Sequence, residues 1–393
     1  MNAFRILAPL AAACQLVPGI VDAMEPEGKD GAYSFDAVYT GELWSLVRGG
    51  LNRGVSYLHN ADLILEADME KAAGFEGGTL FLYGLHTNGS SFSEKRVGDF
   101  QVVSNIDAGT TFRLFEAWYE QKLIDDRLSL KAGLYDLNSE IDVTETGGLF
   151  INSSHGIGPD FSQAGENGPS IFPSTSLAFR IAYEPSERWT VRAAVLDGVP
   201  NDPDHPKRQV IRFKKGEGAL LVGEVEFRPD DRTRMIAGHW SFTAAFDVIE
   251  TGASKRGNSG SYGLIERQLY REPDDHDQGL SAWVRAGAAD ARFNDASAYV
   301  GAGLVYTGLI EGRDADQFGA AVGIALPGDA FSRTLGERSG REIDVELTWR
   351  GEILPWLVLQ PDLQYIRNPG MTDGVRDALA IGLRIEIGRG GRF

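Results

Sequence analysis

Hydrophobic and polar residues alternate along most of the chain, and the segment 341–350 shows this pattern most clearly. Every second residue there is apolar, namely Ile343, Val345, Leu347 and Trp349. The residues between them are acidic or polar, namely Glu342, Asp344, Glu346 and Thr348. Successive side chains of a β-strand point to opposite faces, so this segment predicts a strand with one apolar and one acidic face. In a helix the same charges would be scattered around the whole circumference.

The same period of two recurs along the chain. It is strong at 128–135, 177–183 and 379–388, and weaker at 218–227, 279–289 and 316–326. No helical period is long enough to compete, so the chain is predicted to be all-β. The alternation predicts sixteen strands, near 34–42, 55–68, 78–86, 111–121, 127–135, 176–183, 189–197, 218–227, 233–242, 261–270, 279–289, 297–306, 316–326, 341–350, 355–366 and 377–389.

The predicted connections alternate between short polar turns and long links. The short ones lie at 122–126, 184–188, 228–232 and 351–354, and the long ones at 136–175, 198–217, 243–260 and 327–340. This rhythm is typical of a membrane barrel, whereas a soluble sandwich has no reason to gather its long loops at one end. An even number of strands also places both termini on one side. We therefore expect a 16-stranded antiparallel transmembrane β-barrel (porin), wide enough for a water-filled channel.

The N-terminus has the features of a secretory signal peptide. Arg5 precedes an apolar run over 6–21, and small residues follow at 21–23. We expect residues 1–23 to be removed and 24–393 to form a single outer-membrane barrel domain. A lipoprotein-type cleavage at Cys14 is the alternative. No later apolar run approaches the ~18 residues of a transmembrane helix, and the terminal Phe393 is typical of outer-membrane barrels.

Composition and charge narrow the function classes. The formal net charge is −18, which argues against a nucleic-acid partner because phosphates require a surface rich in Lys and Arg. One cysteine in 393 residues rules out a disulfide framework and a thiolate metal cluster. A hydrophobic fraction of 42% is too high for a disordered acidic chain.

The sequence offers little catalytic chemistry, and we expect no catalytic residue and no cofactor. The six histidines form no H-E-x-x-H or H-x-H pattern, so no metal site is predicted. The run 153–155, Ser-Ser-His, leaves an outer-membrane lipid hydrolase as an alternative, but no G-x-S-x-G motif accompanies it. A calcium site between outer loops is a further alternative, built from Asn201, Asp202, Asp204 and His205. Prolines among these residues favour a rigid turn instead.

Charged and aromatic residues gather in the predicted strand 111–121. Alternation there places one set toward the lipid, namely Phe115, Ala117 and Tyr119. It places the other set toward the lumen, namely Glu116, Trp118 and Glu120. Arg113 lies off this parity and reaches the lumen only if a bulge intervenes.

Strand-borne cations complete the candidate substrate path, which we assign to Arg113, Glu116, Trp118, Glu120, Lys131 and Arg180. A channel for sugars needs charged groups that bind hydroxyls and aromatic rings that stack on pyranose faces. The alternative is that these side chains are ordinary solvated lumen residues, or ion pairs that stiffen the wall.

Short motifs follow one another along the chain, and their order is more specific than any one of them. They are Tyr39-Thr40-Gly41-Glu42 with Gly49-Gly50, Asp62-Leu63 through Asp68 and Lys71, Gln101 to Ile106, Arg113 to Gln121, Gly133 to Glu140, Gly156 to Ser162, Leu359 to Ile366 and Asn368-Pro369-Gly370. In this order the chain resembles the carbohydrate-selective porin (OprB) family of Gram-negative outer membranes.

The resemblance implies a sixteen-stranded monomeric barrel that passively admits glucose and other sugars through a constriction lined by charged residues. It carries this role to Glu116, Arg113 and Trp118, and 136–175 becomes the candidate constriction loop. Expected partners are sugars as permeants and outer-membrane lipid with lipopolysaccharide, for a monomer or homotrimer. A general or cation-preferring porin, favoured by the acidic face at 342–346 that we expect to line water, and a soluble β-sandwich lectin remain alternatives.

Overall fold

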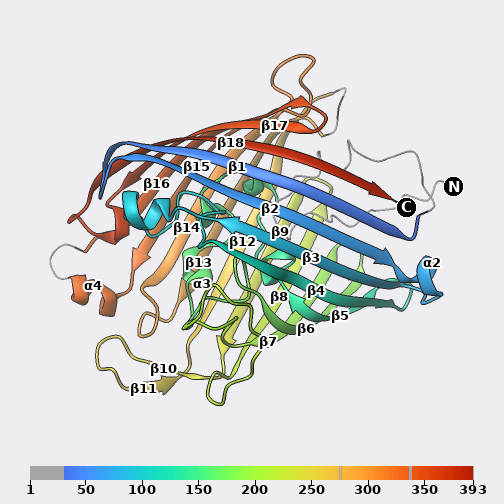
Figure 1. Ribbon diagram of the computed structural model, residues 1–393, viewed down its shortest axis with the longest axis horizontal. Coiled ribbons are helices and arrows are strands. Elements are labelled where there is room, and N and C mark those ends of the chain that lie inside the picture. The colour runs from blue at the N-terminus through green and yellow to red at the C-terminus, as the bar shows by residue number, and fades with distance from the viewer. Residues whose placement is uncertain (1–30, 274, 276, 336–338, 393) are drawn as a thin grey trace.

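The structure is a computed structural model that describes residues 31–392 except 274, 276 and 336–338. Within these residues sixteen strands close into one barrel, each antiparallel to its neighbours (Figure 1). The first and last strands pair directly, with Ser34 opposite Arg392, which closes the barrel. The barrel strands are β1 (Tyr33–Gly50), β2 (Gly54–Asp68), β3 (Gly78–Asn88), β4 (Thr111–Leu123), β5 (Leu128–Tyr135), β6 (Ser176–Ser186), β7 (Trp189–Asp197), β8 (Ala219–Asp230), β9 (Thr233–Phe242), β12 (Ser259–Arg271), β13 (Gly279–Ala289), β14 (Ala296–Thr307), β15 (Gln317–Pro327), β16 (Glu342–Leu354), β17 (Leu357–Arg367) and β18 (Arg376–Arg392).

Each of the sixteen predicted strands overlaps one barrel strand of the described chain, which confirms the predicted fold class. The largest difference in length is at β1, which continues past the predicted end at 42 to Gly50. Sequence reasoning missed β10 (Ala245–Asp247) and β11 (Ser254–Arg256), a small hairpin outside the barrel sheet. Three residues are too few to establish a period of two.

The eight connections that the sequence predicted as short or long alternate as predicted, whereas the β1–β2 turn (51–53) is short although it lies at the end with the long loops. The short turns gather with α2 (Met69–Ala73) at one end, and α4 (Asp329–Leu335) and the β10–β11 hairpin lie at the other end with the long loops (Figure 1). No helix in the described part of the chain is long and apolar enough to cross a membrane. The predicted signal peptide (1–23), Cys14 and Phe393 lie outside the described residues.

The two faces of the strands differ in the way that the alternation predicts. On β16 the outward side chains of Val345 and Leu347 are 40% and 50% exposed, whereas the inward Glu342, Asp344 and Glu346 are fully buried. An apolar outer face is what a lipid environment requires, because charged groups there lose their hydration. The expectation that the acidic face of β16 lines water is wrong, since other parts of the chain cover it.

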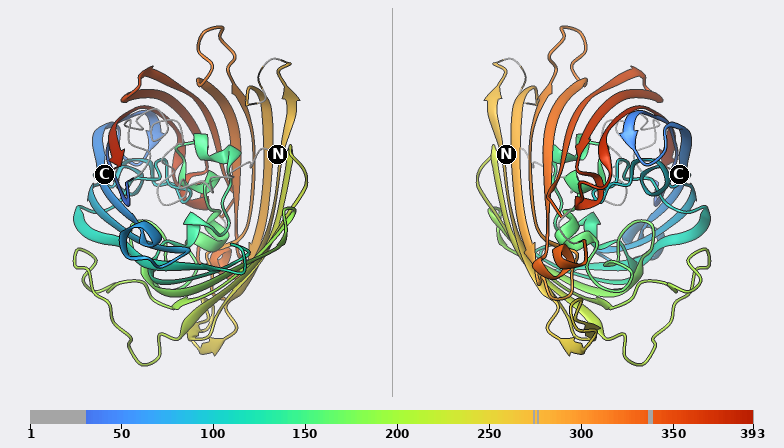
Figure 2. Two further views of the ribbon diagram at one scale, coloured as in Figure 1. Left: turned by 90° about the vertical axis from the view of Figure 1, so that its right-hand side faces the viewer. Right: turned by 90° about the vertical axis from the view of Figure 1, so that its left-hand side faces the viewer.

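Two long loops run inside the barrel and provide this cover (Figure 2). The first, called the inner loop, comprises residues 136–175 and contains α3 (Pro159–Ser162) and short 3₁₀ turns. The second inner loop comprises residues 89–110 and contains the turn Ser93–Val97. Their apolar side chains pack together with inward residues of the wall, as Ile151 and Val103 do around Trp44.

Backbone N–H groups of the two inner loops are bound by glutamates of the wall. Irregular backbone inside a barrel lacks ladder partners, and an unpaired buried N–H is costly. The acceptors lie on β4, β8, β12 and β16. Glu116 accepts from Asp136, Glu224 from Asp142, Glu266 from Glu145 and Thr146, Glu346 from Ile151 and Asn152, and Glu342 from Phe100 and Gln101, at 2.6–3.2 Å.

One arginine of the wall binds the inner loop through its side chain. Nε and Nη2 of Arg285, on β13, donate to both carboxylate oxygens of Asp142 at 2.8 and 2.6 Å. Nη1 donates to Asp160 at 2.7 Å, and all three residues are fully buried. The inner loop is therefore fixed to strands around most of the barrel.

The outward face yields a first prediction. Leu347 lies near the middle of β16 and is half exposed. The Leu347→Arg variant should lose about 2–4 kcal/mol of unfolding free energy, because a guanidinium at the bilayer midplane is poorly solvated. Urea titration in lipid vesicles, followed by tryptophan fluorescence, measures this loss. Ile124→Arg, in the exposed turn after β4, is the matched control and should leave the unfolding free energy unchanged; equal losses in both variants would contradict a lipid-facing Leu347.

Arg285 yields a second prediction. The Arg285→Ala variant leaves the buried carboxylates of Asp142 and Asp160 without their cation, which should cost about 3–5 kcal/mol. Urea unfolding and protease cleavage within 136–175 would both reveal the loosened loop. The control is Arg292→Ala, which removes an exposed pair with Asp290 and should change neither measurement. Unaltered protease resistance in Arg285→Ala would contradict the role assigned to this arginine.

Candidate functional site

A β-bulge in β4 sets which side chains reach the interior. Tyr83 pairs with Glu116 and the next residue, Gly84, pairs with Leu114, so Phe115 is an extra residue between them. Arg113 and Glu116 consequently both point inward. The prediction that Phe115 faces lipid is wrong, since its ring is fully buried and meets that of Tyr83 edge-on at 5.1 Å.

Arg113 lies apart from the other predicted site residues. Its guanidinium donates to the backbone carbonyl of Pro206, in the long loop between β7 and β8, and the residue is buried. Arg113 therefore binds an outer loop, in a part of the interior that does not contain the remaining candidates.

Glu120, Lys131 and Arg180 form one cluster on the inner wall. They lie directly opposite one another on β4, β5 and β6. Arg180 Nη2 donates to Glu120 at 2.9 Å and to Glu140 at 2.7 Å, and Lys131 Nζ donates to Glu140 at 2.7 Å. Sequence reasoning missed Glu140 as a site residue because it belongs to the inner loop, although the motif from Gly133 to Glu140 contains it.

The ring of Trp118 is covered on both sides. Phe81 on β3 stacks on it with centroids 4.6 Å apart, and Lys131 Nζ on β5 lies 3.8 Å from its centroid. The indole N–H donates to Glu116 at 3.0 Å. Because β3 and β5 flank β4 on opposite sides, the two contacts occupy opposite ring faces. Trp118 thus contacts Lys131 and Glu116 at once, and Phe81 and Lys131 already pack against its partly buried ring.

The cluster continues along the wall as a row of paired charges. Arg192 on β7 lies 3.2 and 3.0 Å from Glu224 and Glu226, and Arg234 on β9 lies 2.8 Å from Glu266. Arg228 lies 2.8 Å from Glu145 of the inner loop. We call this set the charge row; it comprises Glu120, Lys131, Glu140, Glu145, Arg180, Arg192, Glu224, Glu226, Arg228, Arg234 and Glu266.

Exposure within the charge row shows which members reach solvent. Glu145 and Arg228 are 47% and 43% exposed, and Glu140 and Arg192 are 23% and 18% exposed, whereas Arg180 is almost completely covered. Burial alone would raise the pKa of Glu140, but Lys131 and Arg180 together hold it well below its usual range. Glu140 is therefore a carboxylate at neutral pH and offers acceptors on the exposed side of the cluster.

The residues of the alternative calcium site and the alternative hydrolase serine contact neighbouring side chains. Asp202 is 2.9 Å from Arg212 and 3.0 Å from His205. The guanidinium of Arg212 therefore already pairs with the carboxylate that the alternative calcium site would use. Ser154 is buried, and its hydroxyl lies 2.8 Å from the Asn152 side chain and 3.1 Å from that of Gln101. A lipid hydrolase needs a serine that the lipid can reach, and the buried Ser154 does not meet this condition.

Comparisons with known proteins give one consistent result. The family model described as carbohydrate-selective porin, OprB family, matches residues 52–388. Porin B of Pseudomonas aeruginosa is 23% identical over 90% of this chain and 87% of its own length. The putative porin QuiX of Acinetobacter baylyi is 20% identical over 90% of this chain and 89% of its own length.

Solved structures agree on the fold. The high-pH structure of Pseudomonas putida OprB superposes with a TM-score of 0.81 at 22% identity, over 92% of this chain and 94% of that one. The outer membrane channel DcaP of Acinetobacter baumannii gives a TM-score of 0.57 at 9% identity. Fold and family both indicate a channel rather than an enzyme. Because the family model spans most of the chain and the barrel matches, this protein belongs to the carbohydrate-selective porin, OprB family.

Proposed function

We propose that this protein lies in the outer membrane and lets sugars such as glucose diffuse passively through its lumen, driven by their concentration gradient. Membership of the family and a barrel of the size that leaves an aqueous channel support this function. The charge row is the observation that carries the proposal, because it supplies donors and acceptors at the edge of the open interior.

The chemistry of the charge row suits a neutral polyhydroxylated permeant. Carboxylates such as Glu120 and Glu140 accept hydrogen bonds from sugar hydroxyls, and the guanidinium of Arg192 donates to them. Since acids and bases lie next to each other, their fields largely cancel, and a small ion gains little by entering. A sugar gains because its hydroxyls act as donors and acceptors at once.

The predicted site residues take different roles in this proposal. Glu120, Lys131 and Arg180, with Glu140, form the substrate path, and the inner loop (136–175) forms the constriction beside it. Glu116 and Trp118 hold the inner loop and Lys131 in position. Arg113 is assigned to an outer loop rather than to the permeant.

A general or cation-preferring porin is the second candidate function. Its main support was the acidic face of β16, and those carboxylates are buried beneath the inner loops. The reversal potential across a salt gradient distinguishes the two functions, because a sugar channel with balanced charges should show little ion preference. The barrel encloses its own path, so one chain suffices for transport, as a monomer or within a homotrimer. Its apolar outer face is suited to outer-membrane lipid and lipopolysaccharide.

The path can be tested at the cluster around Glu140. The Glu120→Gln and Arg180→Gln variants should each weaken glucose block of the single-channel current about 10-fold. The first removes a charged acceptor worth ~1.5 kcal/mol to the sugar, and the second removes the buried guanidinium that holds Glu120 and Glu140 in position. Current recordings in planar bilayers across a glucose series give the half-blocking concentration. Liposome swelling with glucose gives the rate of permeation independently.

Arg188→Gln is the control for this experiment. It makes the same charge change as Arg180→Gln, and Glu187→Gln makes the same charge change as Glu120→Gln. Both residues lie in the exposed turn between β6 and β7, and glucose block should be unchanged in each control. If the wild-type channel conducts without any glucose block, a general porin replaces the sugar channel. If block is present but both cluster variants keep it, the substrate path lies elsewhere in the lumen.

A further inference from the structure

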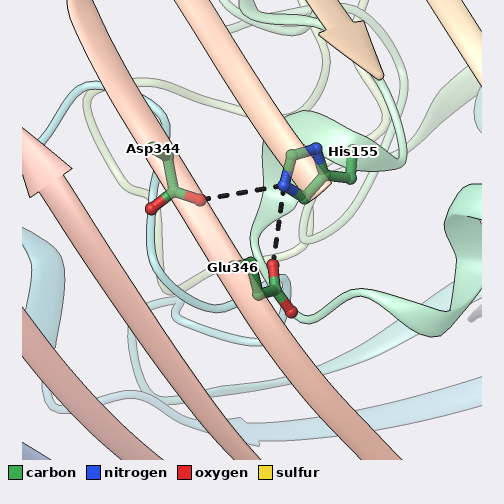
Figure 3. Close-up of side chains that lie close together, drawn as sticks. All are labelled: His155, Asp344 and Glu346. Carbon is green, nitrogen blue, oxygen red and sulfur yellow. Dashed lines mark ion pairs between the residues drawn. The ribbon is translucent and has the colours of Figure 1, made fainter. Parts of the chain in front are cut away.

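A histidine and two carboxylates converge where the inner loop meets β16 (Figure 3). His155 ends the 3₁₀ turn Ser153–His155, and its Nε2 lies 3.7 Å from Oδ2 of Asp344 and 3.6 Å from Oε2 of Glu346. All three side chains are completely buried. The three ligand atoms lie within 4.8 Å of one another.

These groups lack the partners that buried polar atoms normally have. Nε2 of His155 and both carboxylate oxygens of Asp344 have no hydrogen-bond partner. The separations from His155 exceed the limit of a hydrogen bond, so the imidazole does not bind either carboxylate directly. Unpaired buried polar groups are rare in folded proteins and indicate an ion or molecule that joins them.

The concentration of carboxyl groups also favours a bound cation. Asp362, Asp99 and Glu342 surround Asp344, so several carboxyl groups share one buried region. In the described part of the chain, no Lys or Arg forms an ion pair with Asp344 or Glu346. The basic side chain that lies near both carboxyl groups is His155. Burying carboxylates without a counter-ion costs several kcal/mol per charge.

We propose that His155, Asp344 and Glu346 bind a divalent transition-metal ion of the Zn²⁺ type, which joins the inner loop to the barrel wall. Zn²⁺ binds histidine nitrogen and carboxylate oxygen at about 2.1 Å, which places two ligands of a tetrahedral ion ~3.4 Å apart. The observed separations of 3.6 and 3.7 Å are close to this spacing. Ca²⁺ prefers six or more oxygen ligands and is a poorer match for this set.

The surroundings hold the ligands in the required orientation. Nδ1 of His155 lies 3.4 Å from the Tyr299 hydroxyl, which in turn lies 3.2 Å from that of Ser154. A partner at Nδ1 directs Nε2 toward the metal. The backbone N–H groups of Ile151 and Asn152 fix the Glu346 carboxylate at 2.6 and 3.0 Å. The rings of Phe150 and Trp283 pack against that of His155 and shield the site from bulk solvent. With three protein ligands, a single water would complete the tetrahedral shell.

Metal content of the full mature chain provides the direct test. Protein extracted from membranes without chelator, or refolded with Zn²⁺, should contain about one zinc ion per chain by elemental mass spectrometry. His155→Ala and Asp344→Asn should reduce this to near none. His205→Ala is the control, because it removes another histidine that contacts an aspartate, and it should leave the zinc content unchanged. Heat-dependent gel mobility verifies that each variant forms a barrel.

Stability distinguishes this site from an ordinary buried acid. With Zn²⁺ present, wild-type protein should resist urea better than Asp344→Asn. After refolding with EDTA, Asp344→Asn should resist urea better than wild type, because the variant buries one less carboxylate. Tyr299→Phe should weaken zinc binding about 10–100-fold while leaving the three ligands in place. Absence of zinc from wild type under both preparations would overturn the proposal, as would zinc content that His155→Ala and Asp344→Asn leave unchanged. These outcomes do not depend on which molecule permeates the channel.

Discussion

The need of buried backbone N–H groups for acceptors governs the interior of this barrel. Strands satisfy their own backbone through the ladder, but two irregular loops inside the lumen cannot. Glutamates on β4, β8, β12 and β16 fill this role, and Arg285 adds a side-chain clamp. Much of the acidic character of the inner wall is therefore used to hold the loops, and the channel that remains is what these loops leave open.

The same residue type thus performs two different tasks, and coverage by the inner loop decides between them. Glu346 is completely buried and binds backbone, whereas Glu226 on β8 binds no backbone of the described inner loop and pairs with the partly exposed Arg192. Fixing the loop and presenting hydrogen-bonding groups to a permeant are therefore coupled. Because Glu140 belongs to the same loop, we expect a change in a distant clamp to shift Glu140 and, through it, the cluster with Arg180.

The sequence was sufficient for the strands because lipid outside and polar groups inside impose a period of two over many residues. The same reasoning could not place Phe115, since one bulge residue reverses the parity that follows it. It also could not bring Glu140 to Arg180 or His155 to Asp344. Those contacts join an irregular loop to distant strands, and no periodicity records which wall residue a loop side chain will reach.

The pairing of β1 with β18 has a consequence for the order of biogenesis. The strand nearest the N-terminus acquires its second neighbour only from the last residues of the chain. A growing or truncated polypeptide therefore retains two unsatisfied sheet edges, which are prone to pair with other molecules. Contacts of such high sequence separation form slowly. Closure must wait until β18 has been made, and the intermediate requires protection from aggregation until β18 docks on β1.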